Sequence, residues 1–288
     1  MTLSTQVPLA VVTGTSSGIG AATARALARR GFHVLAGVRR DVDADAIRGP
    51  GVEPVILDVT DSEHIAALVD RVRTDPQTRP LRALVNNAAI QINIPVEAFA
   101  IDRWRMMFEV NLFGPVAITQ ALLPHLLAGK GRVVNVSSVG GKVAMAAYGP
   151  YAATKFALEA VSDSLRRELA PSGVRVVVVE PGAIRTRMLN SATAGADEVI
   201  AAMPPELRRR YSALVQAVNG QAAASTESGL PADAAAAVIA TAVTTRRPRT
   251  RYTVGRDAAM ITKMTRFLSD RALDRILVMA LRPHYVGR

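Results

Sequence analysis

The chain has 288 residues, of which 49% are apolar and only 4% aromatic, so its core must consist mainly of aliphatic side chains. The absence of cysteine excludes disulfides, thiolate metal sites and cysteine nucleophiles, and the four histidines have no metal-ligand spacing, so we expect no metal. Thirty-five Lys and Arg against 24 Asp and Glu give a net charge of +11, and segment 245–288, with eleven basic residues and three aspartates, contributes +8 of it.

Short apolar runs alternate with helical patterns along most of the chain. The apolar runs, rich in valine, leucine and alanine, occupy 8–14, 32–38, 53–59, 81–89, 131–138, 173–182 and 250–255. Helical patterns occupy 18–31, 62–74, 102–128, 147–169, 231–245 and 270–281, with a bend expected near Gly114. Continuous apolar runs are typical of parallel strands that are buried on both faces. The sequence therefore predicts an α/β fold with a parallel sheet.

The pattern loosens after residue 182, where 183–229 shows only weak helical periodicity. No linker or internal repeat divides the chain, so we expect one domain over 1–288. Within it, 1–187 is expected to form the cofactor-binding and catalytic core, 188–230 to cover the substrate, and 245–288 to form a basic extension.

A glycine-rich turn follows the first apolar run and opens the first helix, with the pattern T-G-x-x-x-G-I-G over 13–20. Glycines let such a turn tighten, and they let the backbone approach a pyrophosphate at the helix N-terminus. A tight strand–helix turn without a ligand is the alternative. The position at the start of a strand–turn–helix unit favours the phosphate-binding interpretation.

Tyr151 and Lys155 stand four residues apart in a helical segment of small residues, 147–160. Residues at i and i+4 share a helix face, so the hydroxyl and the ammonium are expected to point the same way. Lowering the pKa of a tyrosine from ~10 to ~7 takes about 4 kcal/mol. One ammonium at ~4 Å supplies about that much at an effective dielectric constant near 20. Tyr148 has no lysine four residues later and is expected to line a pocket.

Several motifs in order resemble the short-chain dehydrogenase/reductase family over residues 7–187. They are T-G-x-x-x-G-I-G at 13–20, Asp58, "NNAA" at 86–89, Asn111, Ser138, Y-x-x-x-K at 151–155 and "PGAIRT" at 181–186. The resemblance implies a Rossmann-type, doubly wound parallel sheet of about seven strands with helices on both faces. It also implies a nicotinamide dinucleotide as cofactor.

The resemblance implies four catalytic residues. Tyr151 is the acid/base, Lys155 lowers the pKa of Tyr151 and binds the nicotinamide ribose, and Ser138 holds the substrate oxygen, with Ser137 as its competitor. Asn111 resembles the residue that holds a water in the proton relay; its alternative is a buried helix asparagine bonded to the backbone.

The cofactor-binding set implied by the resemblance is Gly14, Ser16, Ser17, Gly18, Ile19, Gly20, Arg39, Arg40, Asp58, Val59, Asn87, Ala88, Tyr151, Lys155, Pro181, Gly182, Ile184 and Thr186.

The residues after the second apolar run favour NADP(H) over NAD(H). An NAD site usually carries an acidic residue there, which binds the ribose 2′-hydroxyl. Val38 occupies that place, and Arg39 and Arg40 follow it. Arginines bind a 2′-phosphate, although the pair could also be solvated loop residues. Asp58 resembles the residue that contacts the adenine, and an ordinary turn aspartate is its alternative.

The whole chain looks most similar to family members that act on 17β-hydroxysteroids and retinoids. We therefore expect interconversion of a carbonyl and a secondary or primary alcohol on a small lipophilic substrate, in contact with Ile94, Met145, Tyr148 and Met188. A 3-oxoacyl-thioester reductase and a catalytically silent NADP-binding sensor are the alternatives.

The basic extension raises the question of partners. The sequence has no RNP-like aromatic pattern and no helix-turn-helix, so we expect no nucleic acid. Leu273, Ile276, Leu277, Ala280 and Leu281 share one face of the last helix. This face could meet a membrane surface, a partner subunit or the protein's own core. We expect a homodimer or homotetramer that is cytoplasmic or peripheral to the membrane, because no signal peptide and no run of 18 apolar residues is present.

Overall fold

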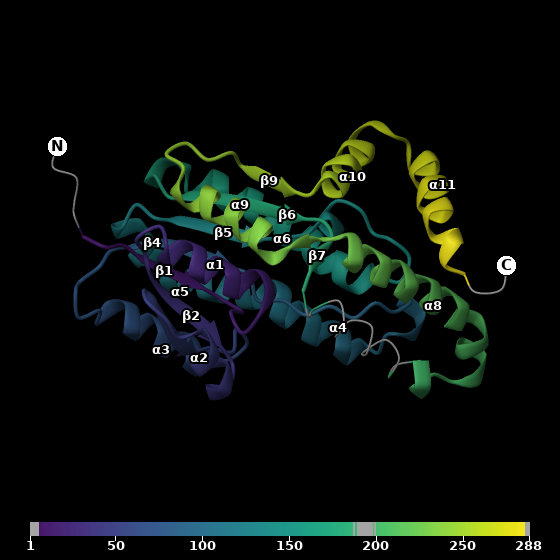
Figure 1. Cartoon of the computed structure of the whole chain (residues 1–288), viewed down its shortest axis with the longest axis horizontal. Coiled ribbons are helices and arrows are strands. Elements are labelled where there is room, and N and C mark those ends of the chain that lie inside the picture. The colour runs from purple at the N-terminus through teal and green to yellow at the C-terminus, as the bar shows by residue number, and fades with distance from the viewer. Residues whose placement is uncertain (1–5, 187, 189–197, 199, 286–288) are drawn as a thin grey trace.

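Seven parallel strands form the central sheet of the protein (Figure 1). The structure is a computed structural model that describes residues 6–186, 188, 198 and 200–285. The sheet has the order β3-β2-β1-β4-β5-β6-β9. The strands are β1 (Leu9–Val12), β2 (His33–Val38), β3 (Val52–Ile56), β4 (Leu81–Asn86), β5 (Arg132–Val136), β6 (Arg175–Pro181) and β9 (Arg251–Val254). Each overlaps one of the seven apolar runs, and only β3 begins one residue before its run, so the predicted Rossmann-type sheet is confirmed.

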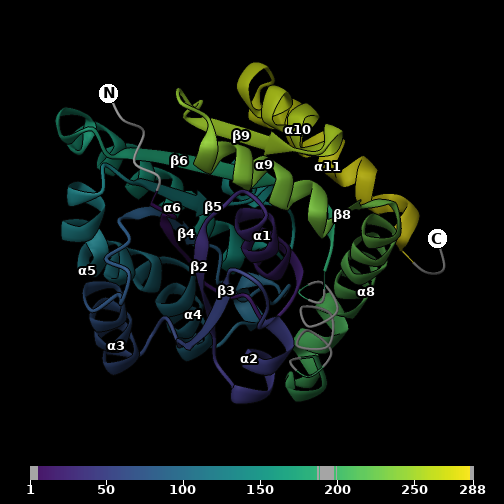
Figure 2. The ribbon, with the colours of Figure 1, turned by 60° about the vertical axis from the view of Figure 1, so that its left-hand side comes forward.

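Helices cover both faces of the sheet (Figure 2). One face carries α1 (Gly18–Ala28), α2 (Asp41–Ile47) and α9 (Ala232–Thr244). The other carries α3 (Ser62–Arg73), α5 (Gly114–Ala128) and α6 (Gly149–Glu168). Alternate residues of β1 serve the two faces, because Ala10 and Val12 belong to the first cluster and Leu9 and Val11 to the second. The continuous apolar strands of the sequence follow from this double burial.

The strand order fixes where a ligand can bind. β1 pairs with β2 on one side and with β4 on the other, so the chain reverses its direction of winding between β1 and β4. In open α/β sheets the crevice outside the carboxyl ends of the strands at such a switch point is the usual ligand site. The glycine turn and the loop after β4 both lie at this point.

The predicted helix over 102–128 contains an irregular turn. It divides into α4 (Ile101–Phe108), a π-helical turn (Glu109–Phe113) and α5. Within the described residues, the stretch Ile101–Ala128 is the one helix long and apolar enough to cross a membrane. Its apolar character has a second explanation, because Ile118, Leu122 and Leu126 are fully buried against the sheet.

The substrate-covering part is more regular than the sequence predicts. Of segment 188–230, residues 189–197 and 199 lie outside the described residues, but Pro205–Ser228 forms the long helix α8. Short strands β7 (Ile184–Arg185) and β8 (Leu230–Pro231) pair beside it. The pattern was weak because the residues of α8 that are buried, such as Ala217 and Ala222, are mostly small.

The basic extension forms two helices, α10 (Arg256–Phe267) and α11 (Asp270–Leu281). They are drawn in yellow in Figure 1, beyond the end of the sheet and next to α8. We call these two helices the C-terminal arm. The arm returns to the body through Leu281, which is buried against Ala217 and Val218 of α8.

Candidate active site

The glycine turn between β1 and α1 is built for a close ligand. Gly14 and Gly18 adopt φ angles of +69° and +56°, which side chains rarely tolerate. A Cβ on Gly20 would lie 2.1 Å from the Gly14 carbonyl oxygen. Ser17, the N-cap of α1, makes no side-chain capping bond, so the first N–H groups of the helix remain open to an anion.

A cavity of about 620 Å³ lies at this turn. Ser16, Ser17 and Gly18 line it, together with the guanidinium-bearing residues Arg25 and Arg185. Open N–H groups, hydroxyls and two arginines are groups that bind phosphate oxygens, so the residues fit the pyrophosphate of a dinucleotide.

The loop after β4 is held directly against the glycine turn. The Asn87 amide donates to the carbonyl oxygens of Thr13 (2.9 Å) and Gly14 (3.1 Å). The Thr13 hydroxyl accepts bonds from the backbone N–H groups of Asn87 (3.0 Å) and Ala88 (2.9 Å). Ala88 packs so closely that a Cβ on Gly14 would lie 2.7 Å from its Cα. Both predicted residues therefore shape the turn.

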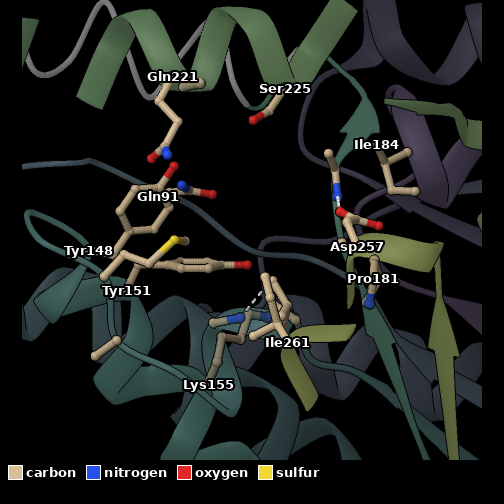
Figure 3. Close-up of a pocket in the computed structure, with 18 of the residues that line it drawn as sticks. Gln91, Tyr148, Tyr151, Lys155, Pro181, Ile184, Gln221, Ser225, Asp257 and Ile261 are labelled. Atoms are coloured by element: carbon tan, nitrogen blue, oxygen red, sulfur yellow. Dashed lines mark hydrogen bonds between the residues drawn. The ribbon is translucent and has the colours of Figure 1, made fainter. Parts of the chain in front are cut away.

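A second cavity of about 710 Å³ adjoins the first (Figure 3). Thr186 lines both cavities. Its side chain lies so close to Gly18 that it would touch a Cβ at that position. The second cavity brings together many of the predicted cofactor and catalytic residues, which are Ile19, Asn87, Ser138, Tyr151, Lys155, Pro181, Gly182, Ile184 and Thr186.

Tyr151 lies in the first turns of α6 and is 6% exposed. Burial raises the pKa of the Tyr151 hydroxyl to about 12, and the hydrogen bond with Ser138 opposes this rise. The expected lowering of this pKa by Lys155 is therefore absent from the structure, because burial outweighs the other influences on the hydroxyl.

Lys155 lies one turn later on α6 and is 2% exposed. Its Nζ donates to the Val136 carbonyl oxygen (3.0 Å) and lies 5.7 Å from the centre of the Tyr151 ring. Burial lowers the pKa of Lys155 to about 8, and the negative charge of Glu159 opposes this fall. An ammonium has three N–H donors, so two of them remain for a ligand after the bond to Val136.

Ser138 follows β5 and faces Tyr151. Its Oγ accepts a bond from the Gly140 N–H (3.0 Å). A hydroxyl that accepts in this way keeps its own proton for donation, here toward Tyr151 or a substrate oxygen. Ser137, its competitor, is more deeply buried at 3% exposed, and its Oγ has no hydrogen-bond partner among the described residues.

Asn111 lies in the π-helical turn and is completely buried. Its Oδ1 accepts from the Ile90 N–H (2.8 Å), and its Nδ2 donates to the Ile90 carbonyl (2.9 Å) and the Thr154 hydroxyl (3.1 Å). The asparagine thus joins the loop after β4 to helix α6. The two bonds to the Ile90 backbone are those expected from the alternative interpretation, in which Asn111 is a buried helix asparagine bonded to the backbone.

The chain matches the family model described as short chain dehydrogenase over residues 8–197, which is more than half of its length. The chain belongs to the short-chain dehydrogenase family. It is 35% identical to retinol dehydrogenase 5 of Mus musculus, over 94% of this chain and 87% of that protein. It is 32% identical to an NADPH-dependent 3-dehydrocapnine reductase of Ornithobacterium rhinotracheale, over 95% of this chain and 97% of that protein.

Solved structures agree with this assignment. A short chain dehydrogenase from Burkholderia cenocepacia, crystallised in complex with NADP, is 28% identical and superimposes with a TM-score of 0.73. The likeness covers 95% of this chain and 99% of that one. The predicted resemblance to the family, and to its retinol dehydrogenase-like members, is thereby confirmed.

The two arginines after β2 differ in this short-chain dehydrogenase. Arg40 is bound by Asp43 through two hydrogen bonds of 2.7 and 2.9 Å. Arg39 makes no hydrogen bond or ion pair with the described residues. Asp58 bonds the backbone and hydroxyl of Thr60, as a turn aspartate does. Burial acts to raise the pKa of Asp58, but the bonds from Thr60 and the charge of Arg39 outweigh it, so this pKa is lowered.

Three of the four predicted substrate contacts lie on the larger cavity. Met145, Tyr148 and Met188 line it. Ile94 does not: it is fully buried in the cluster beneath Tyr151, and its N–H bonds the Ala147 carbonyl (2.7 Å). Ile94 therefore supports the tyrosine from below. Val59 is likewise a core residue, packed against Gly114 rather than on either cavity.

Other cavity residues carried no signal in the sequence. Gln91 stands in an irregular loop, and Gln221 and Ser225 lie in the weakly patterned α8. Asp257 belongs to the C-terminal arm, and its Oδ2 accepts from the Ala183 N–H (2.8 Å). A Cβ on Gly182 would lie 2.2 Å from the same oxygen, so the turn at 182 and the start of α10 fit together only with glycine.

The predicted apolar face of the last helix covers the larger cavity. Ile276, Leu277, Ala280 and Leu281 all line it, as do Met260, Ile261 and Met264 of α10. This agrees with a face that packs on the protein's own body. The arm also exposes Phe267 (77%) and Met279 (55%).

Proposed function

We propose that this protein is an NADP(H)-dependent oxidoreductase that interconverts a carbonyl and an alcohol on a small lipophilic molecule. The observation that carries the proposal is the meeting of Tyr151, Ser138 and Lys155 on the wall of an apolar cavity that adjoins the glycine turn. Family membership alone would not suffice, because a fold can host several functions.

The cofactor is expected to bridge the two cavities. The glycine turn and the N-terminus of α1 would hold the pyrophosphate, and the two remaining N–H donors of Lys155 would bind ribose hydroxyls. Asn87 and Thr186 would border the nicotinamide. When bound, the reduced nicotinamide supplies a hydride to the carbonyl carbon of the substrate.

Proton transfer would complete the reduction. Ser138 donates a hydrogen bond to the substrate oxygen, and the Tyr151 hydroxyl gives its proton to that oxygen as negative charge develops. With a pKa of about 12, Tyr151 is protonated at neutral pH and is ready to donate. Oxidation of an alcohol needs the tyrosinate, which the charge of Lys155 and of an oxidised nicotinamide would both stabilise. Asn111 would hold a water of the proton relay through the lone pair of Oδ1 that the bond from the Ile90 N–H leaves free.

Arg39 supports a preference for NADP(H). It follows β2 and lies near enough to Asp58 to lower the pKa of that carboxyl, but it makes no hydrogen bond or ion pair among the described residues, whereas Arg40 is bound to Asp43. The NADP complex of the Burkholderia structure and the NADPH dependence of the Ornithobacterium reductase are consistent with this preference.

The apolar lining supports a lipophilic substrate. It includes four methionines, Met145, Met188, Met260 and Met264, and a flexible thioether adapts to ligands of irregular shape. The similarity to retinol dehydrogenase 5 points in the same direction. The exposed apolar and basic residues of the C-terminal arm support contact with an anionic membrane surface. We propose that the protein is cytoplasmic and binds the membrane peripherally. We also propose that it is a homodimer or homotetramer and that it has no nucleic-acid partner.

The test is an absorbance assay of NADPH and NADH oxidation, and of NADP⁺ and NAD⁺ reduction, with a panel of lipophilic carbonyls and alcohols. Tyr151→Phe should lower turnover at least a hundredfold, since general acids contribute about 10²–10⁴. NADPH binding, followed by fluorescence, should stay nearly intact, and Tyr148→Phe should be milder.

Two results would contradict the proposal. Turnover of Tyr151→Phe within threefold of the parent would remove the tyrosine from the reaction. Cofactor binding without turnover of any panel member would instead favour a silent NADP-binding sensor. Selective turnover of 3-oxoacyl thioesters would favour the other alternative.

A further inference from the structure

A group of polar side chains interrupts the apolar wall of the larger cavity. Gln91 comes from the loop after β4, Tyr148 precedes the first turn of α6, and Gln221 and Ser225 lie on one face of α8. In Figure 3 the side chains of Gln91, Tyr148 and Gln221 point toward one another. The reaction proposed above uses none of the four.

The hydrogen bonds of this group leave acceptors facing the cavity. Gln91 is 9% exposed, and its Nε2 donates to Asn93 Oδ1 (2.7 Å). Gln221 Nε2 donates to the Ala280 carbonyl of α11 (3.3 Å). Each amide nitrogen is therefore engaged, whereas neither amide oxygen has a bond among the described residues. Neither oxygen is sealed inside the protein, so both acceptors stay open to the cavity and to a ligand that donates a hydrogen bond.

Asn93 adds an independent observation. It is completely buried next to Tyr148, toward whose hydroxyl its amide is turned, and its Nδ2 has no other hydrogen-bond partner in the described part of the chain. Burial raises the pKa of Tyr148, and the neighbouring Asn93 opposes this rise. The Tyr148 hydroxyl is thus kept neutral and next to an amide, so it can both donate and accept a hydrogen bond.

We propose that Gln91, Tyr148 and Gln221 form a second polar subsite, which binds a hydroxyl group of the substrate distinct from the oxygen that reacts. A hydroxyl matches the site because it can donate its one proton to an amide oxygen while its own oxygen accepts a bond from the Tyr148 hydroxyl. This inference rests on the proposed function, since Tyr151 must mark the reacting oxygen.

The position of Tyr148 limits where that hydroxyl can lie on the substrate. Tyr148 and Tyr151 are three residues apart at the start of α6, so the subsite lies about one helical turn, ~5 Å, from the catalytic hydroxyl. The substrate class is therefore a lipophilic ketone or alcohol with a second hydroxyl a few carbon atoms from the reacting carbon.

The experiment compares decan-2-one with its derivatives that carry one hydroxyl at carbon 4, 5, 6 or 9. In the parent, one of the 4-, 5- or 6-hydroxy compounds should show a kcat/KM at least tenfold above that of decan-2-one, and the 9-hydroxy compound should not. Tyr148→Phe and Gln221→Leu should each reduce this ratio toward one. Gln216→Leu, the same substitution at an exposed position of α8, is the matched control and should keep the ratio.

Equal ratios in the parent and in both variants would overturn the subsite but leave the proposed reaction standing. Failure to reduce any ketone, with NADPH still bound, would instead contradict the proposed function and the subsite with it. Tyr148→Phe is the smallest change and carries the test if Gln221→Leu does not fold. Calorimetric titration of the protein–NADPH complex, which cannot oxidise an alcohol, with decan-2-ol and the matching diol gives a second readout, in which the diol should bind more tightly to the parent only.

Discussion

Arg39 and Arg40 show how neighbouring residues of one type acquire different roles. The sequence presents them as an equal pair after β2. The structure separates them, because Asp43 in the first turn of α2 binds the Arg40 guanidinium. An arginine that is already bound by a carboxylate loses part of that interaction if it turns to a phosphate, whereas Arg39 has no such loss.

Arg39→Ala should therefore weaken NADPH binding by about tenfold or more, since a hydrogen bond to a charged group contributes ~1.5–3 kcal/mol. Arg40→Ala should have a smaller effect, and NADH binding should change little in either variant. Dissociation constants for both cofactors, measured by fluorescence titration, check this. Equal losses for NADPH and NADH would show that the arginines do not bind the 2′-phosphate.

Lys155 gives the site a pH dependence. Its pKa is lowered to about 8, so the ammonium is charged below that pH and neutral above it. A neutral lysine cannot stabilise the tyrosinate form of Tyr151, and it binds ribose hydroxyls more weakly than an ammonium does. We expect kcat/KM for NADPH, which reports the free enzyme, to fall as pH rises through about 8.

Glu159→Gln provides the comparison for this profile. The charge of Glu159 raises the pKa of Lys155 against burial, so its removal should move the fall in kcat/KM to lower pH. Melting temperatures of both proteins separate this shift from loss of fold. A profile that stays flat between pH 6.5 and 9.5 would contradict the role of Lys155.

At the scale of elements, the seven strands and most helices follow from sequence, because buried parallel strands leave continuous apolar runs. The helix α8 does not, since alanines provide much of its buried face and give weak periodicity. The predicted motif residues largely converge on the two cavities. Ile94 and Gln221 could not be placed from the sequence. The role of each depends on which elements pack together, and the local spacing of residues carries no information about this packing.

Asp257 joins two elements that are distant in sequence. Its carboxylate ties the first turn of α10 to the backbone at Ala183, beside the turn that would border the nicotinamide. Asp257→Ala removes an acceptor of ~1 kcal/mol, and it should raise KM for NADPH about fivefold. Asp257→Asn keeps an oxygen in place and is the matched control.

Limited proteolysis provides a second readout for this link. In Asp257→Ala the arm should be cut faster than in the parent, and NADP⁺ should protect it less. Unchanged KM together with unchanged cleavage would show that the arm and the cofactor site are independent.

At the scale of the whole molecule, the C-terminal arm both lines the larger cavity and carries exposed apolar side chains. It exposes Phe267 and Met279, and Lys263, Arg266, Arg271 and Arg275 are also exposed on it. Exposed apolar residues can enter a lipid interface, and each basic residue near anionic lipid adds about 1 kcal/mol. A membrane surface at the arm would lie next to the cavity that is expected to receive a lipophilic substrate.

The full-length protein should therefore pellet with anionic liposomes at low salt, less at high salt, and not with neutral liposomes. Phe267→Ser combined with Met279→Ser should reduce pelleting without changing turnover of a soluble ketone. Phe113→Ser, at an apolar position that is 51% exposed on the opposite part of the fold, is the control. Equal pelleting of all three proteins would assign the arm to a partner subunit or to the fold itself.

The π-helical turn at Glu109–Phe113 gives this helix one place that tolerates a change of length. A π turn holds one residue more than an α turn, and each residue of an α-helix advances the chain by roughly 100°. Deletion of one residue from 109–113 would therefore turn the π turn into an α turn, and Met107 would still face the cluster beneath Tyr151. The same deletion within α4 or α5 would rotate one half of the helix against the other. A single-residue gap is thus less damaging here than anywhere else in the same helix.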